Sequence, residues 1–91
     1  MIHTYGVKTG EIWQIDASLT AFGMDKGLFY RGPTNLSKDN TVETFSTADR
    51  SAGIILSEKA KTVDFFGDDI KVAGLMKIIK NIDGISLERA A

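Results

Sequence analysis

The chain has 91 residues, a formal net charge of −1 and no cysteine. A chain of this length has room for one hydrophobic core, so we expect a single domain over residues 1–91. Basic and acidic residues are nearly equal in number, 11 against 12, and are mixed along the sequence, so no long-range field attracts a polyanion. Without cysteine there is no disulfide framework or thiolate metal site, and we expect a cytoplasmic location.

The composition predicts a folded chain without a membrane segment. Hydrophobic residues make up 43% and charged residues 25% of the sequence, both typical of globular domains. The first residues lack a basic region followed by an apolar run, and the apolar runs elsewhere are short, as in Ile54-Ile55-Leu56. We therefore expect neither a signal peptide nor a membrane span.

Residues 2–16 are predicted to form a β-hairpin, because β-forming residues flank a turn at Gly10. Two registers are open. A two-residue loop places Gly6 opposite Trp13, whereas a three-residue loop places Tyr5 opposite Trp13. We prefer the first register because it also sets opposite charges across the turn.

A short helix or an ordered loop is predicted over residues 16–26, followed by a strand over residues 28–31. The strand should end at Gly32-Pro33, because proline cannot donate to a strand ladder. A polar connection over residues 34–40 follows. Since loops carry function more often than strands do, this connection is a candidate recognition loop.

The second half of the predicted sheet begins with a strand over residues 42–45 and a turn or helix start over residues 46–49. Strands over residues 54–58 and 61–66 then form a second hairpin. Pairing in this hairpin places four apolar side chains on one face, which we expect in the core: Ile54, Leu56, Val63 and Phe65.

The clearest helix is predicted over residues 68–82. Asp68 suits its positive N-terminus, and Gly84 is placed to end it. Residues 85–88 are predicted to return as an edge strand. Spacings of three and four produce an apolar stripe that should pack on the sheet, formed by Val72, Leu75, Met76, Ile79 and Ile82.

Together these elements predict an α+β fold. It consists of a small antiparallel sheet of about five to six strands, packed on one face by the C-terminal amphipathic helix. The predicted element order is β-β-(short α)-β-β-β-β-α-β, and the order of strands within the sheet stays open. A sheet that is not closed into a barrel has two edges, and an edge can pair with a partner or with a second copy.

An acidic group near residue 67 suggests one alternative function, a metal-dependent enzyme or a metal-binding domain. Asp64, Asp68 and Asp69 lie at a strand end and a helix start, where Mg²⁺ ligands are often found. Helix capping and outward alternation also explain these residues, so we expect no metal and no other cofactor. His3 is the only histidine and no nucleophile motif accompanies it, so we assign no catalytic residue.

A third hypothesis is a binder of single-stranded nucleic acid. Tyr5, Trp13 and Tyr30 on adjoining strands could form an aromatic platform for stacked bases. The net charge of −1 and the absence of a known RNA-binding motif make nucleic acid an unfavoured partner.

The preferred hypothesis is a non-enzymatic protein-binding module, because the chain is small, lacks a recognisable chemistry motif and offers sheet edges. Such a module acts as a small regulator or inhibitor, of the kind that phages and mobile elements encode, by docking on another protein or on itself as a homodimer. We predict that Tyr5 and Trp13 on the first hairpin contact the partner, together with Leu36 and Lys38 in the loop over residues 32–41.

Overall fold

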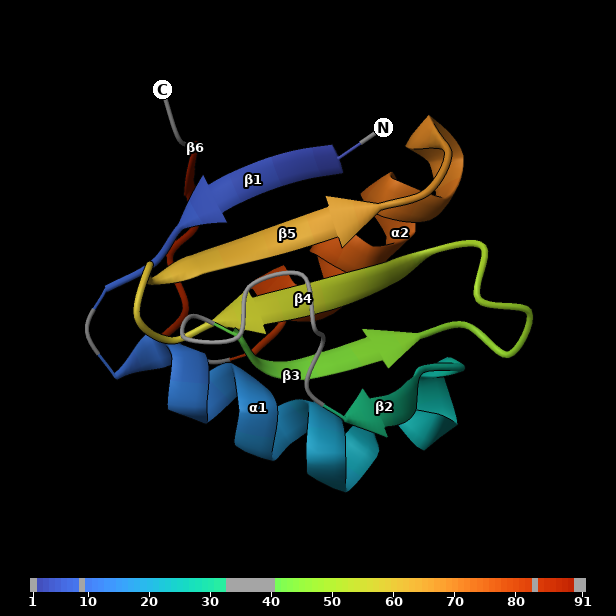
Figure 1. The fold of residues 1–91 in the computed structure, drawn as a ribbon, viewed down its shortest axis with the longest axis horizontal. Helices are drawn as coiled ribbons and strands as arrows, with labels where there is room; N and C mark the ends of the chain where they lie inside the picture. Colours follow the sequence, from blue (N-terminus) through green and yellow to red (C-terminus); the bar gives the residue numbers. More distant parts are fainter. Residues whose placement is uncertain (1, 9, 33–40, 83, 90–91) are drawn as a thin grey trace.

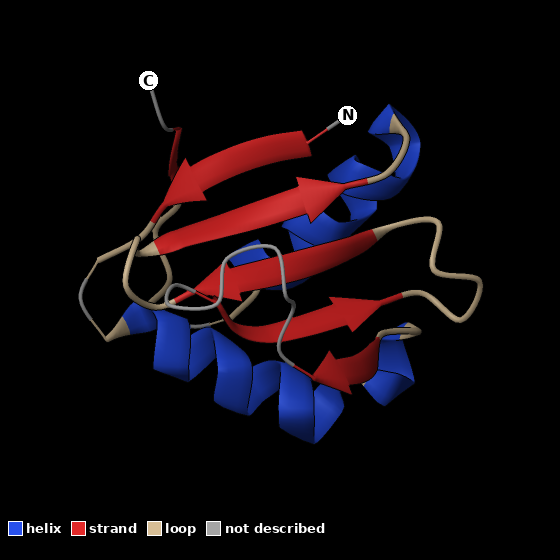
Figure 2. Cartoon of the chain, viewed as in Figure 1, coloured by secondary structure: helices blue, strands red, loops and turns tan. Residues whose placement is uncertain are grey.

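The computed structural model of the chain contains a six-stranded sheet, two α-helices and a short 3₁₀ helix, and it describes residues 2–8, 10–32, 41–82 and 84–89 (Figures 1 and 2). The strands are β1 (Ile2–Gly6), β2 (Phe29–Gly32), β3 (Thr41–Ser46), β4 (Gly53–Ser57), β5 (Thr62–Phe66) and β6 (Glu88–Arg89). The helices are α1 (Glu11–Phe22), the 3₁₀ helix η1 (Met24–Lys26) and α2 (Asp69–Lys80).

All neighbouring strands are antiparallel, in the order β2-β3-β4-β5-β1-β6. Figure 1 shows β1, β5, β4, β3 and β2 from top to bottom, with α2 behind the sheet. The predicted α+β class is confirmed, as is the packing of the C-terminal helix on the sheet.

The predicted second hairpin is confirmed. β4 and β5 pair so that Ile54 lies opposite Phe65 and Leu56 lies opposite Val63. All four side chains are fully buried, because alternation along each strand points them toward the helices. The turn before this hairpin, predicted over residues 46–49, forms without a helix.

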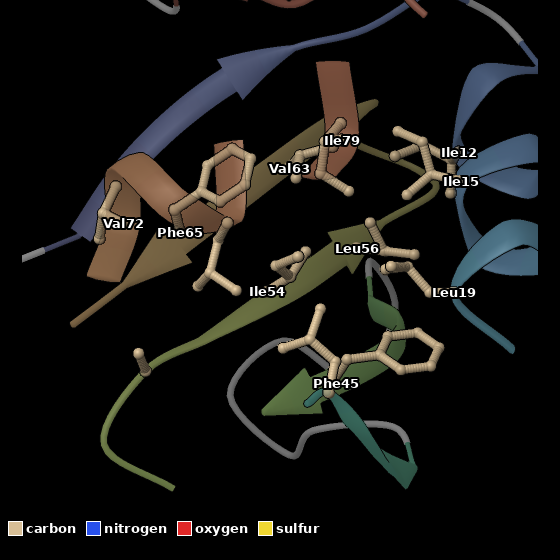
Figure 3. Packing of buried hydrophobic residues seen from close by; sticks show 13 residues of the cluster. Ile12, Ile15, Leu19, Phe45, Ile54, Leu56, Val63, Phe65, Val72 and Ile79 are labelled. Atoms are coloured by element: carbon tan, nitrogen blue, oxygen red, sulfur yellow. The ribbon is translucent and has the colours of Figure 1, made fainter. Parts of the chain in front are cut away.

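The core lies between this face of the sheet and both α-helices (Figure 3). α1 contributes Ile12, Ile15 and Leu19, whose spacings of three and four put them on one side of the helix. The predicted stripe of α2 is confirmed as well, with three residues buried and two packed partly buried at its margin: Val72, Leu75 and Ile79, then Met76 and Ile82.

The predicted hairpin over residues 2–16 is wrong, because its second half belongs to α1. β1 pairs instead with β5, and Tyr5 lies opposite Val63 rather than opposite Trp13. The helical alternative predicted over residues 16–26 is confirmed for residues 16–22, but the helix already begins at Glu11. The residues from 11 to 22 contain a helical apolar stripe that is interrupted when the chain is divided at residue 16.

The turn predicted at Gly10 does form, but it leads into a helix. Gly10 has φ 89°, a left-handed conformation that glycine adopts without steric cost. The next residue, Glu11, is only 6% exposed. Its carboxylate accepts one hydrogen bond from the Lys8 N–H at 2.5 Å and one from the Ser86 N–H at 3.1 Å. Glu11 therefore fastens the start of α1 to the connection that precedes β6.

The predicted start of α2 is confirmed, whereas its predicted end is not. Asp68 caps the N-terminus, and its side chain accepts a hydrogen bond from the Lys71 N–H at 2.8 Å. The helix ends at Asn81, which is its C-cap, so the predicted end at Gly84 is wrong. The returning edge strand is shorter than the predicted range 85–88 and consists of β6, which pairs with the end of β1.

Gly74 occupies an exposed interior position of α2, where a Cβ atom would meet no other atom within 4 Å. Because alanine loses less backbone entropy than glycine in a helix, we expect Gly74→Ala to raise the free energy of unfolding by about 0.5–1 kcal/mol. Urea denaturation measures this change. Gly10→Ala is the matched control and should destabilise, because its φ of 89° strains an alanine.

Candidate functional site

A groove lies between the C-terminal part of α1 and the end of α2, with a volume of about 560 Å³. Leu19 and Phe22 line it from α1, and Ile78 and Ile82 line it from the α2 side. These pairs are three and four residues apart, which places each pair on one flank of its helix. The groove is therefore a product of two helices packing side by side on one sheet face.

The fold leaves two large apolar side chains unburied, one that lines the groove and one that follows it closely in sequence. Phe22 is 63% exposed and Met24 is 72% exposed. α1 ends at Gly23, whose carbonyl accepts hydrogen bonds from the Lys26 and Leu28 N–H groups at 2.9 and 2.8 Å. This tight turn forms η1, in which Met24 is exposed and is flanked in sequence by Gly23 and Asp25, two of the residues that line the groove. Exposed apolar side chains gathered in this way are typical of an interaction site.

A second cluster lies on the other flank of α1, where Asp16 approaches Glu43 of β3 and Tyr30 of β2. Partial burial and the nearby Glu43 carboxylate raise the pKa of Asp16. A hydrogen bond to the Glu43 carboxylate raises the pKa of the Tyr30 hydroxyl, and burial adds to the effect. One carboxylate oxygen of Asp16 and one of Glu43 are buried without a hydrogen-bond partner among the described residues.

The raised pKa of Asp16 allows its carboxyl group to keep a proton at a higher pH than an ordinary aspartate does. None of the three side chains lines the groove, so the cluster and the apolar hollow are separate features. Asp16 can therefore hold a proton, but the cluster does not line the groove between α1 and α2, where a reactant could bind.

Asp16→Asn should stabilise the protein at neutral pH. The folded-state pKa of Asp16 is raised above its ordinary value of 3.8, so its contribution to stability is most favourable below that pH and declines as the pH rises through the folded-state pKa. Asparagine does not ionise and removes the decline. We expect a higher melting temperature than that of the parent protein at pH 7 and a smaller difference at pH 3. Asp25→Asn, at an exposed position, is the control.

The structure separates the predicted partner-contact residues. Tyr5 packs edge-on against Phe65, with ring centroids 5.7 Å apart, on the core side of the sheet. Trp13 is 54% exposed but lies on α1, so it is not the neighbour of Tyr5 on a hairpin. Leu36 and Lys38 lie outside the described residues. Of the four, Trp13 is thus the side chain whose described surroundings leave it open to a partner.

The acidic residues of the metal hypothesis do not converge. Asp64 accepts a hydrogen bond from the Thr4 hydroxyl at 2.5 Å on the opposite sheet face, and Asp68 caps α2. Asp69 is exposed and lies 3.8 Å from the imidazole of His3. Over the described ranges, no three metal-ligating side chains lie close enough together to hold an ion.

The aromatic platform of the nucleic-acid hypothesis does not form either. Tyr5 lies on β1, Tyr30 lies on β2 and Trp13 lies on α1. Three strands separate β1 from β2 in the sheet. Adjacent bases of one strand could not stack on all three rings, so the structure removes the geometric basis of this hypothesis.

The turn between β3 and β4 is held by Asp49. Its carboxylate accepts hydrogen bonds from the Ser51 N–H at 3.0 Å, the Thr47 hydroxyl at 2.7 Å and the Ser51 hydroxyl at 2.8 Å. These bonds hold the pKa of Asp49 far below its usual range. Lys71 of α2 donates to the Ser51 hydroxyl at 2.6 Å. The network has a structural role, because it joins the turn to the start of α2.

The groove is not predicted by the sequence patterns. Phe22 falls in the predicted short helix or loop over residues 16–26. One wall of the groove could have been predicted from the apolar stripe of α1. That stripe consists of Ile12, Ile15 and Leu19 and continues to Phe22 in the next turn. The facing wall on α2 depends on tertiary packing.

None of the helices in the described ranges is long and apolar enough to cross a membrane. No family model matches the chain, and no curated protein or solved structure matches it.

Proposed function

We propose that this protein is a non-enzymatic protein-binding module that docks through the groove between α1 and α2. The supporting observation is an apolar hollow of about 560 Å³ that is lined by Phe22, a large apolar side chain that is mostly exposed. Burial of such side chains is the dominant favourable contribution in protein association. The groove can therefore receive an apolar anchor from a partner while Phe22 packs against that anchor.

The polar groups at the rim favour a protein over a small molecule. Asp25 and Lys26 lie next to each other there and carry opposite charges. Small-ligand sites usually enclose the ligand and direct a few convergent polar groups at it. A partly open apolar groove with charges of both signs at its edge corresponds instead to the apolar centre and polar rim of a protein interface.

Docking of this kind gives a simple mode of action. A small chain that occupies a functional surface of another protein regulates or inhibits it by exclusion, without a catalytic group. The charges of the chain nearly cancel, so affinity should depend on apolar contact and respond only weakly to salt.

Site-specific photo-crosslinking tests the proposal. A benzophenone amino acid replaces Met24, and the same substitution at Ile70, which is 86% exposed on α2, serves as the control. We expect position 24 to trap one defined protein in a lysate of the source organism and position 70 not to trap it. The trapped protein is then purified and its Kd measured.

Phe22→Ala should weaken that complex at least tenfold, because an aromatic anchor at an interface contributes about 2 kcal/mol or more. Phe22 is 63% exposed in the free protein, so the variant should keep its fold, which circular dichroism checks. Absence of an adduct from position 24, or an unchanged Kd with Phe22→Ala, would rule out the groove as the docking site.

A further inference from the structure

We infer that Asp16 of α1 and Glu43 of β3 share one proton, in a hydrogen bond that fastens α1 to the sheet in acid and is lost as the pH rises toward neutrality. Asp16 lies about one helical turn from Ile12 and from Leu19, two residues that bury α1 in the core. A bond from Asp16 to β3 therefore acts at the middle of the helix. The inference goes beyond the proposed function, because it concerns the free protein and needs no partner.

Two buried oxygen atoms without a donor carry the inference. Oδ1 of Asp16 and Oε2 of Glu43 are both shielded from water, and neither has a hydrogen-bond partner among the described residues. A carboxylate oxygen that leaves water without gaining a donor loses its hydration, which is unfavourable. The charge of Glu43 acts on Asp16, so the two carboxylates are neighbours. One proton on Asp16 turns its oxygen into a donor and gives the Glu43 oxygen its missing partner.

Glu43 is the acceptor in this pair. The Tyr30 hydroxyl of β2 donates a hydrogen bond to the Glu43 carboxylate, and this bond raises the pKa of Tyr30. An ionised carboxylate has lone pairs for several donors, so Glu43 can accept a second hydrogen bond from Asp16. Burial and then the Glu43 charge raise the pKa of Asp16, which makes Asp16 the group that takes up the proton.

No described cation takes the place of the proton. Glu43 of β3 and Tyr30 of β2 are the titratable groups coupled to Asp16 in the described part of the chain. β4, which α1 also contacts, has no charged residue. Asp25 and Lys26 of η1 line the groove, which Asp16 does not, and α2 lies across that groove on the other flank of α1. Two negative charges therefore face each other once Asp16 ionises.

Loss of this bond weakens the attachment of α1 to the sheet. The folded-state pKa of Asp16 is raised above 3.8, so the stabilising contribution is fully present below pH 3.8 and is lost as the pH rises through the folded-state pKa. Local opening of α1 should then be more frequent at neutral pH than in acid. α1 supplies Leu19 and Phe22 to the groove, so the change acts on one wall of that groove.

A titration of the Asp16 carboxyl group by NMR tests the shared proton. We expect the folded-state pKa of Asp16 to lie above 3.8 in the parent protein and to fall in Glu43→Gln, because a neutral amide removes the charge that favours the protonated form. Glu88→Gln, an exposed position on β6 at the other edge of the sheet, should leave that pKa unchanged. An Asp16 pKa that Glu43→Gln does not lower would show that burial alone raises it, and the shared proton would be overturned.

Hydrogen exchange tests whether the bond holds α1. Asp16→Asn donates an amide N–H to Glu43 at any pH, so at pH 7 the Ile15 and Leu19 amides should exchange more slowly in this variant than in the parent. The expected ratio is roughly tenfold for each pH unit between 3.8 and the measured folded-state pKa. At pH 3 the two proteins should exchange alike, and Asp25→Asn should match the parent at both pH values. Equal exchange in the parent and Asp16→Asn at pH 7 would overturn the inference.

Discussion

Phe65→Ala should lower the free energy of unfolding by about 3–5 kcal/mol, the largest loss that we expect from a single substitution. Phe65 is fully buried on β5, opposite Ile54, and its ring contacts Tyr5. Removing the ring leaves a cavity in the core next to Tyr5 of β1 and Ile54 of β4. Since small domains are stable by only about 5–15 kcal/mol, the variant should be largely unfolded at moderate urea concentrations.

Phe66→Ala is the matched control for this prediction. Phe66 is the next residue on β5, points to the opposite face of the sheet and is only half-buried. We expect a loss less than half as large, measured by urea denaturation with circular dichroism. Equal losses for the two variants would contradict the assignment of the two sheet faces.

The second half of the sheet was predictable because its determinants are local. Residues 53–66 form a hairpin whose strands are adjacent in sequence, and alternation alone identifies Ile54 and Phe65 as core residues. The helical stripe of α2 is likewise contained in one continuous segment with a capping residue, Asp68, at its start. Nothing outside these segments was needed to assign them.

The first half of the fold was not predictable in the same way. The residues from 11 to 15 alone are compatible with a strand, and the helical stripe becomes evident only when Leu19 is included. The partner of β1 is β5, so that Thr4 bonds to Asp64 across 60 positions of sequence. A long-range pairing of this kind leaves no local trace, whereas a nearby turn suggests a hairpin that does not form.

The candidate site depends even more on tertiary structure. Phe22 and Ile78 become the two walls of a groove because α1 and α2 pack on the same face of the sheet. Asp16 and Glu43 meet because α1 crosses beside β3. The sequence shows the amphipathic helices, but the side on which a helix leaves its apolar residues exposed depends on where its neighbour lies.

Glu11→Ala is expected to lower the free energy of unfolding by about 2–4 kcal/mol. Its carboxylate is almost fully buried and accepts hydrogen bonds from the Lys8 and Ser86 N–H groups. Alanine would leave two donors without this acceptor. A hydrogen bond to a charged group contributes about 1.5–3 kcal/mol. Both donors belong to exposed residues that water can reach in the variant, so the loss should be smaller than the sum of two such bonds.

Glu11→Gln separates the hydrogen bonds from the size of the side chain. Glutamine keeps the length but has one acceptor oxygen, so it can replace one of the two bonds and should cost about half as much as alanine. Amide hydrogen exchange gives the local test, since protection at Lys8 and Ser86 should fall with alanine and persist at one of them with glutamine. Unchanged protection in both variants would mean that other contacts hold the start of α1 to the segment before β6. The expected result instead makes one buried carboxylate responsible for joining the N-terminal turn to the C-terminal edge of the sheet.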